Sequence, residues 1–244
     1  MEFIKNGVPE VGPEFLKPTE FFDFDDNAVR QFAYGAATGA ATAKEKAVNL
    51  FYAVRDQIRY DPYRIRLERD LFKASSVLAA KAGFCLPKAN LLIAACRAVG
   101  VPAAIGLSDV LNHLCTDRLR HIMGGKDQFL HHGYAVIHIE DKWVKAAPAF
   151  NIELCQKFDV LPTEFDGENH ALFQEFDAKG RKHMEYSTDH GIWSEFPFER
   201  VAKDFSDYYP ESFYVDAERE AANKAFDAMK DAERKNFEEE KPIA

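Results

Sequence analysis

One cysteine and a pair of histidines have the residue types and spacing needed for nucleophilic chemistry. Cys85 follows Gly83-Phe84 and opens a densely apolar run, so the sequence predicts that it begins a buried helix. The free N–H groups and the dipole at a helix start favour a thiolate, which is the reactive form of cysteine. Lys88, one turn further on, would add a positive charge to that field. The alternative is that Cys85 is an inert buried thiol, as most free cysteines are.

A nucleophilic cysteine needs a base, and His131 and His132 lie together in a strand-like run, FLHHGYAVIHI. Side chains alternate along a strand, so the two rings should point to opposite sides and only one can face the cysteine. The doublet could also bind a metal together with a cysteine, but the sequence offers no carboxylate or cysteine partner at ligand spacing. We therefore expect a thiol–imidazole pair, with no metal and no other cofactor.

The other three cysteines have no comparable placement. Cys96 falls inside the predicted helix, and Cys115 and Cys155 lie in segments with no helix-capping geometry. No C-x-x-C pair is present, which argues against a structural zinc site or a thioredoxin-type redox pair. Four cysteines in a chain of 244 residues do not make a disulfide framework, so we expect free thiols in a reduced, cytoplasmic protein.

Composition excludes several classes of protein. Hydrophobic residues make up 47% of the chain and aromatic residues 13%, which argues against disorder. The 31 basic and 40 acidic residues give a net charge of −9, which argues against a nucleic-acid-binding protein. The N-terminal segment has no long apolar stretch and contains Pro9 and Pro13, so it does not resemble a signal peptide. No segment approaches the roughly 18 apolar residues of a membrane-spanning helix, so we expect no membrane association.

Helix and strand patterns surround the candidate residues. The apolar run from Cys85 ends at Gly100, and Pro87 is allowed in the first turn of a helix. Runs of β-branched and aromatic residues predict strands at residues 101–107, 129–139 and 143–147, the last two as a hairpin. Further helices are expected after a cap at Asp26, at residues 44–58, from Ser75 to a break at Gly83, at 114–122 and at 152–158.

These elements predict one domain spanning residues 1–244. Its core is expected at about residues 45–150, preceded by a lead-in and helix at 1–44. An aromatic-rich extension at 151–215 could form a lid over the site or an extension of the core. A charged helix is expected at 216–244.

The segment around Cys85 resembles the transglutaminase-like superfamily. In that family a cysteine heads a helix that ends in a glycine–proline turn into a strand, as Gly100-Val101-Pro102-Ala103 does here. The run His132-Gly133-Tyr134 is similar to the family's histidine strand, and Trp143-Val144-Lys145 is similar to its following tryptophan strand. The resemblance covers roughly residues 45–150 and suggests a single-domain member of bacterial type.

The resemblance implies a fold and two catalytic roles. The fold is α+β and papain-like, with the cysteine at a helix N-terminus packed on an antiparallel sheet that carries the histidine. Cys85 is the implied nucleophile and His132 the implied general base. The Cys85 N–H would stabilise an oxyanion, and Tyr60 and Trp143 are candidates for contacts with the oxyanion or the substrate. The alternative for both aromatic residues is simple packing.

One departure concerns the third catalytic residue. The family places an aspartate before the proline that ends the tryptophan strand, but here Ala147 precedes Pro148. A substitute would have to orient the imidazole. Asn151 and Asp166 are the candidates, with alternative roles as a helix cap and a turn former.

The implied function is acyl transfer through a Cys85 thioester. The acyl donor would be a peptide, a protein or a small-molecule amide, and either water or an amine could resolve the thioester. The absence of a calcium-binding loop of the EF-hand kind favours a peptidase or amidase over a protein cross-linker. The alternative is an inactive member that binds a peptide or small molecule in the same cleft. The sequence does not indicate an oligomeric state.

Overall fold

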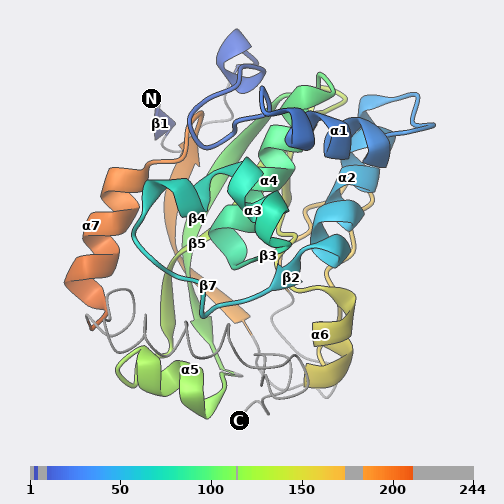
Figure 1. Cartoon of the computed structure of the whole chain (residues 1–244). Coiled ribbons are helices and arrows are strands. Elements are labelled where there is room, and N and C mark those ends of the chain that lie inside the picture. Colours follow the sequence, from blue (N-terminus) through green and yellow to red (C-terminus); the bar gives the residue numbers. More distant parts are fainter. Residues whose placement is uncertain (1–2, 5–9, 114, 174–183, 211–244) are drawn as a thin grey trace.

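The fold is a layer of helices on one face of a five-stranded antiparallel sheet (Figure 1). The computed structural model describes residues 3–4, 10–113, 115–173 and 184–210. The main sheet has the spatial order β1-β7-β4-β5-β6, and a short parallel pair joins β2 to β3. The predicted α+β fold class is confirmed.

The strands are β1 (Phe3–Ile4), β2 (Arg59–Tyr60), β3 (Ala82–Gly83), β4 (Ala103–Asn112), β5 (Gln128–Ile139), β6 (Lys142–Ala146) and β7 (Met184–Trp193). The helices are α1 (Asn27–Ala36), α2 (Ala43–Gln57), α3 (Ala74–Ala80), α4 (Cys85–Ala98), α5 (Asp117–Ile122), α6 (Ile152–Phe158) and α7 (Phe198–Tyr208). Short 3-10 turns lie at Pro13–Phe15 and Arg69–Phe72.

The first two helices begin where their caps predict. Asp26 accepts hydrogen bonds from the first N–H groups of α1. Thr42 and Glu45 form a capping box at the start of α2, in which each side chain accepts an N–H from the other residue. Helix α3 differs from the prediction at its end: it stops at Lys81, which takes the left-handed conformation, whereas Gly83 lies in β3.

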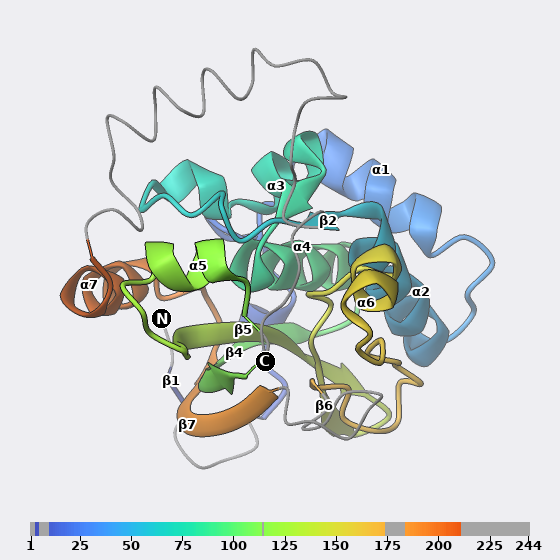
Figure 2. The same cartoon turned by 90° about the horizontal axis from the view of Figure 1, so that it is seen from below.

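Helix α4 is the centre of the helical layer. Every residue from Leu86 to Arg97 is buried. The helix contacts β4 and β5 on one side and α1, α2 and α3 on the other, and Figure 2 shows it between the sheet and the outer helices. A helix that is apolar all round is expected in such a fully enclosed position.

Arg97 fastens the end of α4 to three other segments. Its guanidinium donates hydrogen bonds to the carbonyls of Ala103 at 2.9 Å, Lys17 at 2.9 Å and Ser194 at 2.7 Å. It also lies 4.6 Å from the centre of the Phe22 ring. These contacts hold the aromatic part of the N-terminal lead-in on the core.

The predicted hairpin forms, and β7 completes the sheet beside it. Strands β5 and β6 pair through Ala135↔Ala146 and Ile139↔Lys142, around a turn at Glu140-Asp141. Strand β7 pairs with β4, although it lies beyond residue 150, the predicted end of the core. Residues 184–193 therefore extend the core, as one of the two alternatives for this segment predicts.

Two expectations about the chain as a whole have different outcomes. The charged helix expected at 216–244 lies outside the described residues. Within the described part of the chain, no helix is both long enough and apolar enough to span a membrane.

Candidate active site

Cys85 occupies the first turn of α4, as predicted, and its thiol faces β5. The side chain is half-buried, whereas Cys96, Cys115 and Cys155 are fully buried. The sulfur is hydrogen-bonded by the backbone N–H groups of Gly133, Leu86 and Cys85 itself.

Burial raises the pKa of the Cys85 thiol to about 11, and these three N–H groups offset only part of that rise. An unperturbed thiol has a pKa near 8.5. The resting side chain is therefore a protonated thiol, not the thiolate that its position at the helix start predicts.

Lys88 does not face the thiol, and the prediction that it adds to the local positive field is wrong. Its side chain is fully buried and its Nζ donates to the carbonyl oxygens of Arg55 at 2.9 Å and Ile58 at 2.5 Å. These carbonyls lie at the C-terminal end of α2, where four carbonyl groups lack partners within the helix. Lys88 therefore joins α4 to α2.

Gly133 brings β5 close to the start of α4. A Cβ atom at this position would lie 2.6 Å from Leu86 Cδ2 and 3.1 Å from Leu86 Cα. A glycine inside a strand often marks such a close approach of backbone. The contact explains how the Gly133 N–H reaches the sulfur of Cys85.

Replacing Gly133 with alanine is expected to push β5 away from α4. The added methyl group would meet the Leu86 backbone, which cannot change rotamer as a side chain can. We expect a loss of about 1–3 kcal/mol in the free energy of unfolding, as for other overpacked cores, measured by urea denaturation. The matched control is Gly35→Ala, in α1, where an added Cβ meets nothing within 4 Å. Equal stability of the Gly133 variant and the wild type would contradict this close approach.

His132 lies in an aromatic enclosure formed by Phe173 and Tyr186. Its ring centre is 4.9 Å from that of Phe173 and 6.0 Å from that of Tyr186. The side chain is buried, and its Nε2 has no hydrogen-bond partner among the described residues. Burial lowers the pKa of His132 to about 3, so the imidazole is neutral at pH 7.

The two neighbouring histidines diverge, as predicted. His131 has a positive φ of 51° where the pairing of β5 with β4 shifts register, and its Nε2 is bonded to Asp204 of α7. His132 instead directly precedes Gly133, the residue whose N–H contacts the Cys85 sulfur. The histidine chosen from the family resemblance is therefore next in sequence to the thiol's backbone contact.

Three tyrosines line the surroundings of the thiol. The Cys85 sulfur interacts electrostatically with the phenol groups of Tyr60, Tyr186 and Tyr209. Burial raises the pKa of all three phenols above the ordinary value, so they are neutral donors near the sulfur. Tyr60 is thus near the thiol, as its candidate role requires.

Trp143 lies on the other side of the sheet. It packs with Phe15, Tyr134 and Val136 in the smaller of two core clusters, whereas Cys85 packs against the larger cluster. The Trp143 and Phe15 ring centres are 5.1 Å apart. Trp143 therefore has the packing role that was its alternative, and it does not flank the thiol.

Asn151 is the N-cap residue of α6, but its side chain does not cap that helix. Its Oδ1 accepts the backbone N–H of Tyr60 at 3.0 Å, and its Nδ2 donates to Glu153 at 3.0 Å. Asn151 therefore holds the segment that carries Tyr60. Edge-on and tilted ring contacts continue from there through Tyr60, Phe150, Phe173 and His132.

Asp166 forms its own turn. Its carboxylate is exposed and accepts hydrogen bonds from the N–H groups of Glu168 and Asn169 and from the Asn169 side chain. These bonds lower the pKa of Asp166 well below its usual range. The structure thus gives Asp166 the turn-forming role. Ala147, at the position of the family's aspartate, is buried and its N–H donates to the Ala171 carbonyl.

Gly133, Tyr186 and Tyr209, all near the thiol, were not among the predicted site residues. Gly133 was detectable, because a glycine directly after the candidate base inside a strand indicates a close backbone contact. Tyr186 had no local signal, because only the pairing of β7 with β4 brings it to this end of the sheet.

The comparisons with known proteins agree with this arrangement at the level of the family. Residues 30–148 match the model of the transglutaminase-like superfamily. No curated protein has a sequence that matches this chain.

Two solved structures are similar to the chain. A candidate cysteine protease from Cytophaga hutchinsonii has 16% sequence identity and a TM-score of 0.43, over 73% of this chain and 53% of that one. A candidate protease from Parabacteroides distasonis has 16% identity and a TM-score of 0.34, over 52% of this chain and 25% of that one. This chain thus spans about half the length of the first protein and a quarter of the second.

The region that matches the family model contains the cysteine at a helix start, the glycine–proline turn, the histidine strand and the tryptophan strand, in the order that the resemblance requires. Through residues 30–148, the chain belongs to the transglutaminase-like superfamily.

Proposed function

We propose that the protein is a cysteine-dependent enzyme that transfers an acyl group through a Cys85 thioester, with His132 as general base. The observation that carries this proposal is the Cys85 thiol at the start of α4, hydrogen-bonded by the backbone N–H of Gly133 in the strand that also contains His132. The half-buried state of Cys85 supports it, since a nucleophile must be reachable. The substrates are amides of peptides, proteins or small molecules.

The protonation states favour proton transfer during the attack over a preformed ion pair. The raised pKa of Cys85 and the lowered pKa of His132 both favour the neutral thiol and the neutral imidazole. The thiol proton passes to His132 as the sulfur adds to the carbonyl carbon, and His132 then gives it to the leaving amine. Water or a second amine resolves the thioester and regenerates the thiol.

Backbone groups supply the electrostatic stabilisation. The N–H groups of Cys85 and Leu86, which contact the resting sulfur, belong to the first turn of α4, where they have no carbonyl partner from a preceding turn of the helix. They can bind the oxyanion that forms on the carbonyl oxygen. The neutral phenols of Tyr60 and Tyr186 lie within electrostatic range of the sulfur. Asn151, the sequence candidate for orienting His132, accepts the Tyr60 N–H and donates to Glu153.

The pH dependence of cysteine alkylation tests the proposal. With a pKa of about 11, roughly one Cys85 thiol in ten thousand is ionised at pH 7. The rate of iodoacetamide modification at Cys85 should therefore keep rising above pH 9. Peptide mass spectrometry should show faster modification at Cys85 than at Cys96, which is fully buried.

The His132→Ala variant separates the two ways in which a histidine can assist. If His132 acts only during the attack, its loss should leave the alkylation profile of Cys85 nearly unchanged and should slow turnover. A resting ion pair would instead give an apparent pKa well below 8.5 that rises in the variant. Modification of Cys85 no faster than that of Cys96 would sink the nucleophile assignment.

One observation favours the alternative of an inactive binding protein. Ala147 stands where the family has an aspartate, and the Nε2 of His132 has no hydrogen-bond partner among the described residues. Without an orienting partner, the imidazole lacks a group that holds its tautomer. This alternative predicts no turnover of any amide or ester by the wild type, together with retained binding.

A further inference from the structure

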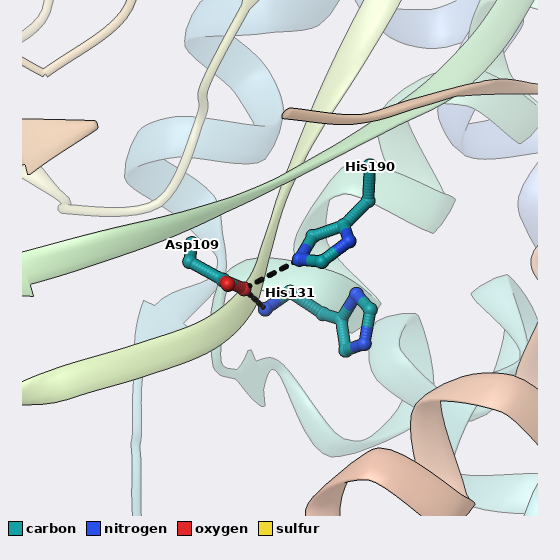
Figure 3. Close-up of side chains that lie close together, drawn as sticks. All are labelled: Asp109, His131 and His190. Atoms are coloured by element: carbon teal, nitrogen blue, oxygen red, sulfur yellow. Dashed lines mark hydrogen bonds and ion pairs between the residues drawn. The ribbon is translucent and has the colours of Figure 1, made fainter. Parts of the chain in front are cut away.

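A second cluster of histidine and carboxylate side chains lies where β4, β5 and β7 meet α7. Asp109 comes from β4, His131 from β5, His190 from β7 and Asp204 from α7. Figure 3 shows the first three side chains, with the rings of His131 and His190 turned toward each other. The ring centres are 4.3 Å apart. None of these residues has a role in the proposed acyl transfer.

The hydrogen bond of His131 to Asp204 determines which ring nitrogen is free. Asp204 Oδ2 lies 2.7 Å from His131 Nε2, and a carboxylate can only accept, so Nε2 carries the proton of the neutral ring. Nδ1 then has a lone pair. This atom is buried in a residue that is 1% exposed, and it has no hydrogen-bond partner among the described residues. A buried lone pair without a donor is costly unless a cation binds it.

The neighbouring side chains offer two more ligand atoms at short range. One ligand atom from each of Asp109, His131 and His190 lies within 4.8 Å of the other two. In the metal-free state, His190 Nε2 is 2.8 Å from Asp109 Oδ1, which also accepts the His131 backbone N–H. Two imidazoles and one carboxylate suit zinc and similar transition metals.

The strand geometry explains how three neighbouring strands direct their side chains to one point. The pairing of β4 with β5 shifts register between Ser108 and Val110, and the pairing of β4 with β7 shifts on both sides of Asp109. Bulges of this kind redirect side chains and are frequent at functional sites. Local sequence spacing could not reveal the cluster, because its members are up to 95 residues apart in the chain, from Asp109 to Asp204.

We propose that Asp109, His131 and His190 form a binding site for a divalent transition metal of the zinc class, with Asp204 as the carboxylate that orients His131. A metal-bound histidine commonly donates its other N–H to a carboxylate, which is the arrangement of His131 and Asp204. The sequence predicts no metal site because no partner lies at ligand spacing from His131. The carboxylate of Asp109 and the imidazole of His190 come from other strands, β4 and β7.

Binding requires one proton shift at His190. Its Nε2 now donates to Asp109, and its Nδ1 lies 3.2 Å from the Arg200 guanidinium, which donates to it. A metal on Nε2 displaces that proton, and Nδ1 takes one up as Arg200 turns aside. No net proton is released. The Arg200 side chain is 41% exposed, so it can move away from His190 into solvent. The His190 side chain is 16% exposed, so a metal ion can reach it from solvent.

Cobalt titration of the full chain tests the site. Cobalt(II) reports its ligands through its visible absorption, and the Cys85→Ala protein removes the half-buried thiol as a competing ligand. After removal of metals with a chelator, we expect one cobalt ion per chain, a spectrum of nitrogen and oxygen ligands without a sulfur charge-transfer band, and displacement by zinc.

Variants in the same Cys85→Ala background locate the ion. His190→Ala should weaken binding at least about 10-fold, and Asp204→Asn about 10- to 100-fold, the effect typical of residues that orient metal ligands. His121→Ala, an exposed histidine in α5, is the matched control and should bind normally. Zinc should also raise the melting temperature of the control and have less effect on His190→Ala.

The proposal fails if the Cys85→Ala protein shows no saturable cobalt binding. It also fails if either the His190 or the Asp204 variant binds cobalt as tightly as the His121 control. The Asp204 side chain is partly exposed, so we expect the Asp204→Asn variant to fold. It can therefore test the site even if the His190→Ala variant does not fold. Acyl-transfer activity has no part in these readouts, so the outcome is independent of the proposed function.

Discussion

Replacing Cys85 with alanine is expected to abolish turnover of a generic activated ester such as p-nitrophenyl acetate, down to the uncatalysed background. The physical reason is that no thioester can form without the sulfur. The fold should survive, because the side chain is small and only half-buried. Release of nitrophenol measures activity, and thermal denaturation measures stability.

The matched control for this prediction is Cys96→Ala, in the same helix. Cys96 is fully buried and lies away from the start of α4, so its replacement should leave turnover near the wild-type rate despite a small loss of stability. If Cys85→Ala retained activity while Cys96→Ala lost it, the assignment of the nucleophile would be wrong.

Replacing His132 with alanine is expected to lower turnover by about 100- to 10,000-fold, the range typical for the loss of a general base. The thiol of Cys85 has a pKa of about 11, so its proton must be removed as the sulfur attacks. The pKa of His132, about 3, keeps the ring neutral through the whole physiological range, so its nitrogens carry no extra proton before the attack. Steady-state ester turnover measures the effect.

His138→Ala serves as the control for this variant. His138 belongs to the same strand, six residues from His132, and its ring packs on Trp143 at 5.2 Å between ring centres. Its replacement should leave turnover within a few-fold of the wild type. A His132 variant with normal turnover would show that another group accepts the thiol proton.

Local patterns in the sequence predict the elements that carry the two catalytic candidates. The apolar run that starts at Cys85 and the alternation around His132 are properties of single segments, and both elements form as expected. Caps such as Asp26 are equally local, since they depend on the next few N–H groups. The order of these segments was enough to identify the family.

Contacts between distant segments account for what the sequence did not predict. The charge of Lys88 is directed to α2 and not to the thiol, because the carbonyls at the end of that helix lie within its reach. The pKa of Cys85 depends on burial by the whole core, which outweighs the helix-start N–H groups that the sequence indicates.

The sequence also did not predict strand β7 or the residues that it brings to the two sites. It lies beyond a stretch without a clear strand signal, yet it brings Tyr186 toward the thiol and His190 toward Asp109. Pairing between strands far apart in sequence leaves no periodic trace in either segment. The candidate metal site could therefore be recognised only from the folded chain.

The most direct test of the central claim is to locate the acyl group on the enzyme. The protein is mixed with p-nitrophenyl acetate, quenched in acid within the first turnover, and analysed by intact and peptide mass spectrometry. We predict a single acetyl group on Cys85 that hydroxylamine removes, formed far more slowly in His132→Ala. No adduct on Cys85, or an adduct that forms equally fast in the His132 variant, would contradict the account.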